Sequence, residues 1–253
     1  MTHLIEADHV VIRYGTHTAL AASTFHVPRV GATAVIGPNG SGKSSLLSAF
    51  AGLVPTASGT LRVLEQEPVQ AQRRLSYVLQ HTAVAKTTPI TVREAVGLGA
   101  YPKVGLWRRF GAAEKAAVAG AMEQMGISHL SERHLHELSG GQRQRVYVAQ
   151  AMVQTHEVLL LDEPLTGLDL VSAQTIDDLI HRERQDRCSV LLTTHDLDEA
   201  RAADWVLLVN RTVLAFGPPA EVLTRHNLEI AYGLGALHGW EGFLDQHTDD
   251  EVP

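Results

Sequence analysis

The chain has 253 residues, with 21 Lys+Arg against 28 Asp+Glu, a formal net charge of −7, and 45% hydrophobic residues. This composition is that of an ordinary globular protein and excludes disordered, collagen-like and disulfide-stapled classes. A chain of this length buries enough apolar surface to fold without a metal or a disulfide. The single cysteine, Cys188, excludes an internal disulfide and favours a reducing compartment. The acidic balance argues against nucleic-acid binding.

Membrane insertion and secretion are not expected either. No stretch reaches the roughly 18 apolar residues that a spanning helix needs, and the longest apolar runs, such as Val158–Leu161, have the length of buried strands. The first residues, Met1–Val11, include Glu6 and Asp8 and lack a basic region followed by a long apolar stretch. A secretory signal is therefore not predicted.

The pattern of apolar runs and turn residues predicts the following elements in chain order. They are strands at 4–13, 24–28 and 32–36, a helix at 43–51, strands at 60–63 and 75–79, helices at 91–97, 112–125 and 142–153, a strand at 158–161, a helix at 172–184, a strand at 189–193, and a hairpin of 206–209 with 212–216. Strands that alternate with helices predict an α/β fold with a parallel sheet. In such a sheet, functional loops lie at the carboxyl ends of the strands.

A phosphate-binding loop follows the third predicted strand. Gly37–Ser44 matches G-x-x-x-x-G-K-[ST] at every fixed position. Gly40 and Gly42 let the backbone turn its N–H groups toward phosphate oxygens, and the next helix adds its positive N-terminal end. Lys43 supplies a cation for the β- and γ-phosphates, and the Ser44 hydroxyl suits Mg²⁺.

Two acids follow the most apolar strand. Val158–Leu161 runs directly into Asp162 and Glu163, so a buried strand delivers both carboxylates to the edge of the sheet. Asp162 is predicted to hold Mg²⁺ through water, and Glu163 to polarise the attacking water as general base. Mg²⁺ and a nucleoside triphosphate are therefore expected, and the resemblance described next implies that the nucleotide is ATP.

A second glycine-containing motif, Leu138–Gln142, resembles the signature sequence of ATP-binding cassette (ABC) ATPases. Its serine and two glycines precede a helix and provide a second anion-binding end. The resemblance spans about residues 4–223. It implies a P-loop NTPase of the ABC ATPase type: a mixed, mainly parallel sheet core, an antiparallel β subdomain and a helical subdomain that carries the signature. The residues so assigned to ATP in the two motifs are Asn39, Gly40, Ser41, Gly42, Lys43, Ser44, Ser45, Ser139, Gly140, Gly141 and Gln142.

The resemblance also implies roles for residues that are weak signals alone. Tyr14 matches the aromatic that stacks on adenine, and Gln80 matches the glutamine that senses Mg²⁺ and faces the membrane subunit. Asp169 matches the loop that couples the two sites of a dimer, and His195 matches the switch histidine at the γ-phosphate. In the family, the signature caps the γ-phosphate held by the other subunit. One chain carries both motifs, so a homodimer with two composite sites is expected.

The segment Thr82–Tyr101 is similar to the segment after the glutamine loop in importers of zinc, manganese and iron, through Pro89, Ile90, Thr91, Val92 and Glu94. The implied function is ATP-driven uptake of a divalent metal, zinc or manganese. The implied partners are a separate membrane permease and an extracytoplasmic binding protein, with the cassette on the cytoplasmic face. Importers of siderophores, haem or vitamins, a separate-chain exporter, and a soluble cassette that acts on DNA repair, ribosomes or Fe–S assembly are the alternatives.

The charges separate a C-terminal segment from the rest of the chain. All 21 Lys+Arg lie at or before Arg225, whereas 226–253 holds six acids and no Lys or Arg. We therefore predict an acidic tail over 226–253, and the resemblance implies an ATPase domain over 1–225 with the helical subdomain at about 85–155. Of the 14 histidines, only His195 lies in a nucleotide motif. The others are interpreted as satisfied or exposed, with a metal-sensing tail through His226, His238 and His247 as the alternative. Cys188 precedes a strand and is predicted to be a buried core residue.

Overall fold

A computed structural model of the chain describes residues 3–80, 89–105, 110–185 and 187–233. Most of the predicted acidic tail, from residue 234 on, and residues 82–88 of the importer-like segment lie outside the described residues. No helix among the described residues is long and apolar enough to span a membrane.

The strands form two sheets. The first is antiparallel, in the order β2 (His17–Pro28), β1 (His3–Tyr14), β4 (Thr56–Val63). The second has the order β5 (Leu75–Val78), β6 (Val158–Asp162), β7 (Ser189–Thr194), β3 (Gly31–Ile36), β8 (Trp205–Val209), β9 (Val213–Gly217). Its neighbours run parallel except β8 and β9, which form the predicted antiparallel hairpin.

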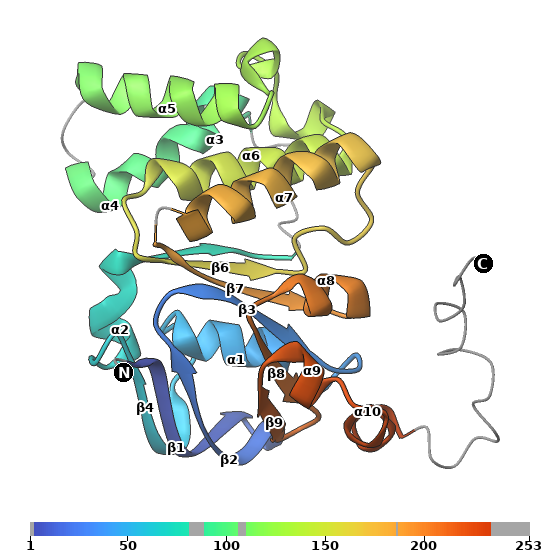
Figure 1. Ribbon diagram of the computed structural model, residues 1–253. Helices are drawn as coiled ribbons and strands as arrows, with labels where there is room; N and C mark the ends of the chain where they lie inside the picture. The colour runs from blue at the N-terminus through green and yellow to red at the C-terminus, as the bar shows by residue number, and fades with distance from the viewer. Residues whose placement is uncertain (1–2, 81–88, 106–109, 186, 234–253) are drawn as a thin grey trace, which may run out of the picture.

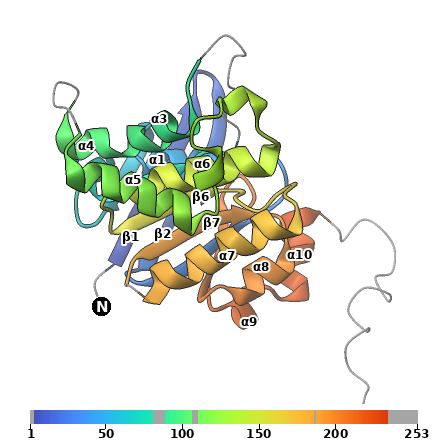
Figure 2. The same cartoon turned by 90° about the horizontal axis from the view of Figure 1, so that it is seen from above.

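Helices cover both faces of the second sheet (Figures 1 and 2). Helix α1 (Lys43–Phe50) lies between the two sheets, and its apolar face joins a core that both sheets share. A helical layer packs on the opposite face and forms a second core. It comprises α3 (Val92–Gly97), α4 (Tyr101–Val104), α5 (Ala112–Gln124), α6 (Gly140–Val153) and α7 (Leu170–Gln185). Because helices and a second sheet cover both faces, β6 and β7 are buried along their whole length.

Short helices complete the described chain. They are α2 (Pro68–Ala71), α8 (Leu197–Ala202), α9 (Pro219–Val222) and α10 (Arg225–Tyr232), with 3₁₀ turns at Gln72–Arg74, Leu98–Ala100, Ser128–Leu130 and Leu135–Glu137. The mixed sheet, the antiparallel sheet and the helical layer confirm the predicted fold class. Three expectations need correction. The second strand begins at His17 and not at residue 24, the strand predicted at 60–63 begins at Thr56, and the short helices α2, α4, α8, α9 and α10 were not predicted. Helices of four to eight residues give little periodicity, and no motif marks these five as the phosphate loop marks α1.

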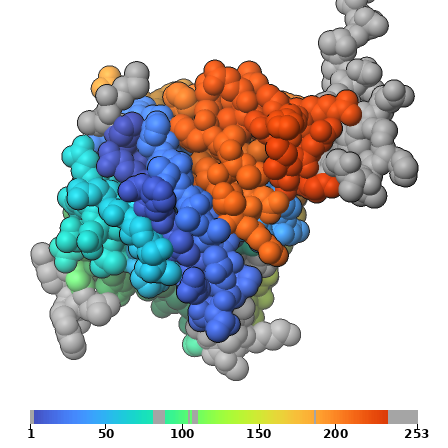
Figure 3. Space-filling view, turned by 90° about the horizontal axis from the view of Figure 1, so that it is seen from below, coloured from blue at the N-terminus to red at the C-terminus, as the bar shows by residue number. Residues whose placement is uncertain are grey.

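The two ends of the described chain are joined on one side of the molecule. Figure 3 shows the first strands (blue) beside the C-terminal segments (orange). The Ala21 N–H donates to the Arg211 carbonyl (2.6 Å), and the Val213 N–H donates to Ser23 Oγ (3.0 Å). These bonds attach the turn and β9 of the hairpin to β2.

An ion-pair network fixes the entry to β6. Arg74 donates two hydrogen bonds to the Glu157 carboxylate (2.6 and 2.7 Å), and Arg29 donates a third (2.6 Å). The hydrogen bond from Arg74 is the main cause that lowers the pKa of Glu157 from its ordinary value of 4.5. Glu157 thereby ties the turn before β6 to the turns before β5 and β3.

We expect Glu157→Gln to lower the free energy of unfolding by about 0.5–1 kcal/mol at pH 7, a modest value because the carboxylate is 42% exposed and screened by water. The folded-state pKa is below the unfolded one, so this stabilisation is present above pH 4.5 and is lost as pH falls through the lowered pKa. Urea titrations of both proteins between pH 7 and 3 measure it. An undiminished difference at low pH would contradict the ion-pair origin.

Candidate active site

The phosphate loop joins β3 to α1. Gly42 takes φ 104°, and a Cβ there would lie 2.6 Å from the Ala19 carbonyl oxygen, so only glycine fits this turn. No side chain caps the N-terminus of α1. The first N–H groups of the helix are therefore left for an anion.

The lysine of the loop is fixed by the loop itself. Lys43 is buried, and its Nζ donates to the carbonyl oxygens of Gly37 (2.8 Å) and Pro38 (3.1 Å). Burial lowers the pKa of Lys43, and the carboxylates of Glu163 and Asp162 act in the opposite direction. The ammonium group is thus positioned before any phosphate arrives.

Asp162 is the point where three segments meet. Its Oδ1 accepts hydrogen bonds from Ser44 Oγ (3.0 Å) in α1 and from Thr193 Oγ1 (2.6 Å) in β7. Asp162 and Thr193 are direct neighbours in the parallel register of β6 and β7. Thr193 was not among the predicted site residues, although its place just before Thr194-His195 at the end of a buried strand is a signal.

Glu163 is held by neighbours on both sides. Its N–H donates to Thr193 Oγ1 (2.8 Å), and Gln80 Nε2 donates to its carboxylate. Gln80 follows β5, the strand next to β6. Glu163 also has φ 47°, which is uncommon for a residue other than glycine. This conformation costs energy and persists only where the surrounding structure enforces it. The turn after β6 is therefore shaped to present this carboxylate.

These groups face one cleft of about 890 Å³. Of the residues predicted for ATP and its hydrolysis, the cleft is lined by Tyr14, Asn39, Gly40, Ser41, Gly42, Lys43, Ser44, Ser45, Gln80, Glu163 and His195. Asp162 lies buried behind Ser44. The lining also includes His17, Thr166 and Tyr232, which the sequence analysis missed. Tyr232 comes from α10, so residues beyond the predicted domain boundary at 225 reach the cleft.

The signature residues form a separate group. Ser139 caps α6: its Oγ accepts the Gln142 N–H (3.2 Å), and the Gln142 side chain accepts the Ser139 N–H (3.1 Å). Asp169 accepts bonds from the Ser172 N–H (2.9 Å) and Oγ (2.8 Å), which lower its pKa. A Cβ on Gly141 would lie 2.7 Å from Asp169 Oδ2, so the two loops touch.

Among the described residues that line the cleft, none belongs to this second group of Ser139, Gly140, Gly141, Gln142 and Asp169. The structure thus brings the predicted residues together in two places. One is a cleft built around the phosphate loop, and the other is the contact between the signature and the loop before α7.

A phosphate loop joins the buried parallel strand β3 to a helix, and two acids follow β6, which β7 separates from β3 in the sheet. This arrangement defines a P-loop nucleotide hydrolase. The family model described as ABC transporter matches residues 20–166. The manganese transport system ATP-binding protein MntB of Listeria monocytogenes is 34% identical over 90% of this chain and 96% of its own length. The zinc transport system ATP-binding protein TroB of Treponema pallidum is 37% identical over 91% and 87%.

Among solved structures, a metal-chelate type ABC transporter in an inward-facing conformation has a TM-score of 0.79 at 25% identity, covering 91% of this chain and 89% of that one. The chain belongs to the ABC transporter family, and it is the ATP-binding, ATP-hydrolysing component of a transport system.

The Thr193 hydroxyl can be removed without changing the shape of the side chain, which tests its role in the site. Thr193→Val removes the bonds to Asp162 and Glu163 while keeping the shape of the side chain, and Thr193→Ser restores the hydroxyl. We expect kcat for ATP hydrolysis to fall about 10- to 100-fold in the valine variant, as for other residues that orient catalytic groups. KM for ATP should change little, and the serine variant should recover most of the activity. Steady-state phosphate release measures this, and equal kcat values for the three proteins would contradict it.

Proposed function

We propose that this chain is the ATPase of a membrane importer that takes up a divalent transition metal, manganese or zinc. The observation that carries the hydrolytic part is the network of Gln80, Glu163, Thr193 and Asp162 beside the phosphate loop. The cargo is supported by the relatives, because a manganese and a zinc transport system ATP-binding protein both match about nine-tenths of the chain.

The proposed chemistry uses the groups in the cleft. The N–H groups at the start of α1 and the Lys43 ammonium bind the β- and γ-phosphates. Glu163 accepts a proton from the attacking water, and Gln80 orients the Glu163 carboxylate through the hydrogen bond it donates. Tyr14, 46% exposed at the cleft, offers a ring to adenine. His195 lines the same cleft and is assigned to the γ-phosphate.

Mg²⁺ fits the donors of this site. The Ser44 hydroxyl, the Asp162 carboxylate and the amide oxygen of Gln80 are hard oxygen ligands, and the first two already lie 3.0 Å apart. These three residues would hold the ion. When bound, it neutralises charge on the phosphate oxygens.

A second copy of the chain completes the proposed site. Ser139, Gly140, Gly141, Gln142 and Asp169 do not line the cleft of their own chain. The signature therefore has no phosphate-binding cleft beside it in its own chain. We propose a head-to-tail homodimer in which Ser139 and the α6 N-terminus of one copy meet the γ-phosphate in the cleft of the other, with Asp169 coupling the two sites.

Glu163→Gln tests the general base and the dimer together. We expect ATP turnover to fall at least 100-fold, since general-base catalysis is worth about 10²–10⁴. We also expect ATP to hold the variant as a dimer, because binding is intact while the chemistry is blocked. Phosphate release and light scattering with ATP and Mg²⁺ measure both. Glu157→Gln, a matched change at the other end of β6, should keep its turnover. Unchanged hydrolysis in Glu163→Gln would remove Glu163 as the base.

We further propose that the helical layer binds the permease. A groove of about 780 Å³ lies there, formed by α3, the turn after it and α5. Its apolar lining includes Ile90, Leu98, and the paired rings of Tyr101 and Phe110, whose centroids are 5.2 Å apart. Leu98 is 44% exposed. An apolar groove rimmed by charges suits a helix of a membrane subunit. This contact would place the chain on the cytoplasmic face of the membrane, and an extracytoplasmic binding protein would deliver the metal.

Leu98→Glu tests coupling and cargo in the host cell. A charge in the groove should abolish ATP-dependent uptake while the isolated chain keeps at least half of its ATPase activity. Cellular manganese, zinc and iron are measured by mass spectrometry, and the metal that falls identifies the cargo. Val69→Glu, at an apolar position on α2 that is 65% exposed and lies outside the groove, is the control. If uptake of all three metals is unchanged while ATPase activity persists, the groove is not the contact with the permease.

The predicted domain limits remain a proposal. An ATPase domain over 1–225, a helical subdomain at about 85–155 and an acidic tail over 226–253 are consistent with the helical layer of α3–α6. The contribution of Tyr232 to the cleft argues for including α10 in the ATPase domain.

A further inference from the structure

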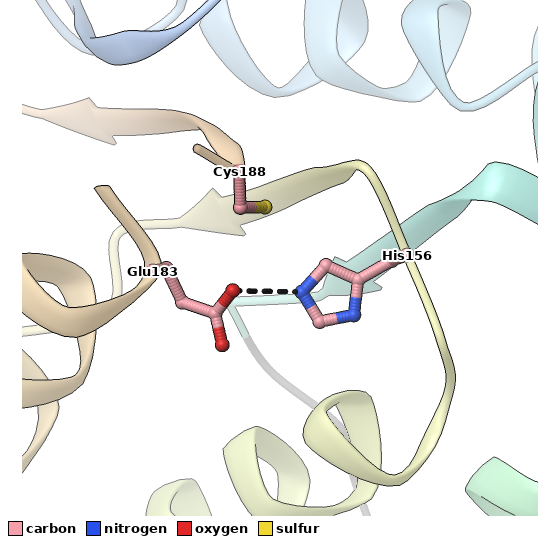
Figure 4. A group of neighbouring side chains, drawn as sticks. All are labelled: His156, Glu183 and Cys188. Atoms are coloured by element: carbon pink, nitrogen blue, oxygen red, sulfur yellow. Dashed lines mark ion pairs between the residues drawn. The ribbon is translucent and has the colours of Figure 1, made fainter. Parts of the chain in front are cut away.

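Three side chains with metal-binding atoms meet at the opposite end of β6 and β7 from the nucleotide cleft. His156 precedes β6, Glu183 lies in the last turn of α7, and Cys188 precedes β7. Their ligand atoms all lie within 4.8 Å of one another. Figure 4 shows the three side chains gathered around one small space between these elements. Among the described residues, these three side chains form the cluster that could hold a metal ion.

The hydrogen bonding of His156 suits a residue that ligates a metal ion. Its side chain is 6% exposed, and its Nδ1 lies 2.7 Å from the Gln154 carbonyl oxygen. A carbonyl only accepts hydrogen bonds, so Nδ1 carries a proton and the lone pair of the neutral ring is on Nε2. Nε2 is buried and faces Glu183 Oε2 at 3.4 Å as an ion-pair partner. Burial lowers the pKa of His156, but the Glu183 carboxylate and the Gln154 carbonyl outweigh it, so the pKa is raised. A cation bound between Nε2 and the carboxylate would take the place of that proton. A histidine that ligates a metal has this arrangement, with the other ring nitrogen bonded to a backbone carbonyl.

The other two groups complete a mixed ligand set. The Glu183 carboxylate is 19% exposed, so it opens the site to solvent on one side, and Cys188 is buried. One nitrogen, one oxygen and one sulfur are ligands that zinc accepts, with bonds of about 2.0–2.3 Å and a fourth position left for water. Tetrahedral bonds of that length separate ligand atoms by about 3.3–3.8 Å. The longest separation here therefore needs to shorten by only about 1 Å.

We infer that His156, Glu183 and Cys188 form a binding site for a thiophilic divalent transition-metal cation, for which zinc is the probe. Binding releases to solvent the proton of the Cys188 S–H bond and, from a charged His156 ring, the Nε2 proton. The thiolate, the His156 Nε2 lone pair and the Glu183 carboxylate then coordinate the cation. The site goes beyond the proposed transport function. It lies apart from the ATP cleft and needs neither a permease nor a nucleotide.

The site joins three separate pieces of the fold. A bound cation would cross-link the entry to β6, the end of α7 and the entry to β7. Asp162 and Thr193, at the other ends of the same two strands, organise the ATP cleft. Because binding to the folded state alone stabilises it by mass action, the cation should raise the melting temperature of the chain.

Cobalt titration of the full, chelator-treated chain without nucleotide tests this inference. The chain has one cysteine, so a thiolate-to-cobalt charge-transfer absorption reports on Cys188 alone. We expect the absorption to saturate at one equivalent and to vanish when zinc is added. It should be absent in Cys188→Ser, and the apparent affinity should fall at least tenfold in His156→Gln and Glu183→Gln. His181→Gln, an exposed histidine on the same helix as Glu183, is the matched control and should bind as the wild type does.

The wild-type titration decides the matter even if a variant folds poorly. No thiolate absorption in the wild type would overturn the inference and leave His156 and Glu183 as an ion pair. An absorption of undiminished affinity in both His156→Gln and Glu183→Gln would also overturn it, since the thiol would then bind cobalt by itself. Zinc should raise the melting temperature of the wild type and of His181→Gln, but not that of Cys188→Ser. Since no ATP is present, neither result bears on the ATPase proposal.

Discussion

The hydrogen bond between Thr193 and Asp162 joins the ends of two adjacent parallel strands, and most of the cleft is arranged around it. Through Asp162 it reaches Ser44 at the start of α1, and through the Glu163 N–H it fixes the turn that follows β6. Both residues are buried, so the bond is made in a low-dielectric setting where an unpaired polar group is expensive. The same threonine therefore aligns a carboxylate suited to a metal ion and a carboxylate suited to a water molecule.

The second constraint is the separation of the two anion-binding helix ends within one chain. The α1 N-terminus has no side-chain cap, whereas the α6 N-terminus is closed by the reciprocal bonds of Ser139 and Gln142. The uncapped end lies in the cleft and the capped end does not. In the proposed homodimer, the capped end of one copy would meet the uncapped end of the other.

The sequence predicted the parts of the site that are local in the chain. A strand followed by Gly37–Ser44, and another followed by Asp162 and Glu163, place their groups by strand direction alone, and both lie where predicted. Thr193, His17 and Tyr232 were not predicted as site residues, because their positions depend on strand register and on the packing of a helix. Burial of Cys188 was predicted correctly, yet its neighbours were not, since His156 and Glu183 come from different elements with no motif spacing. The roles of the site residues stay predictions until they are measured.

The strand order has a consequence for how the molecule is made. The central strand β3, at residues 31–36, pairs only with β7 and β8, at residues 189–194 and 205–209. During synthesis on the ribosome, the phosphate loop is therefore made long before the two strands that pair with β3. Pairings so distant in sequence are slow to form, because the intervening loop must first be closed at a cost in entropy. The strands that hold β3 and its phosphate loop in the sheet are consequently complete only when the last quarter of the chain is being synthesised.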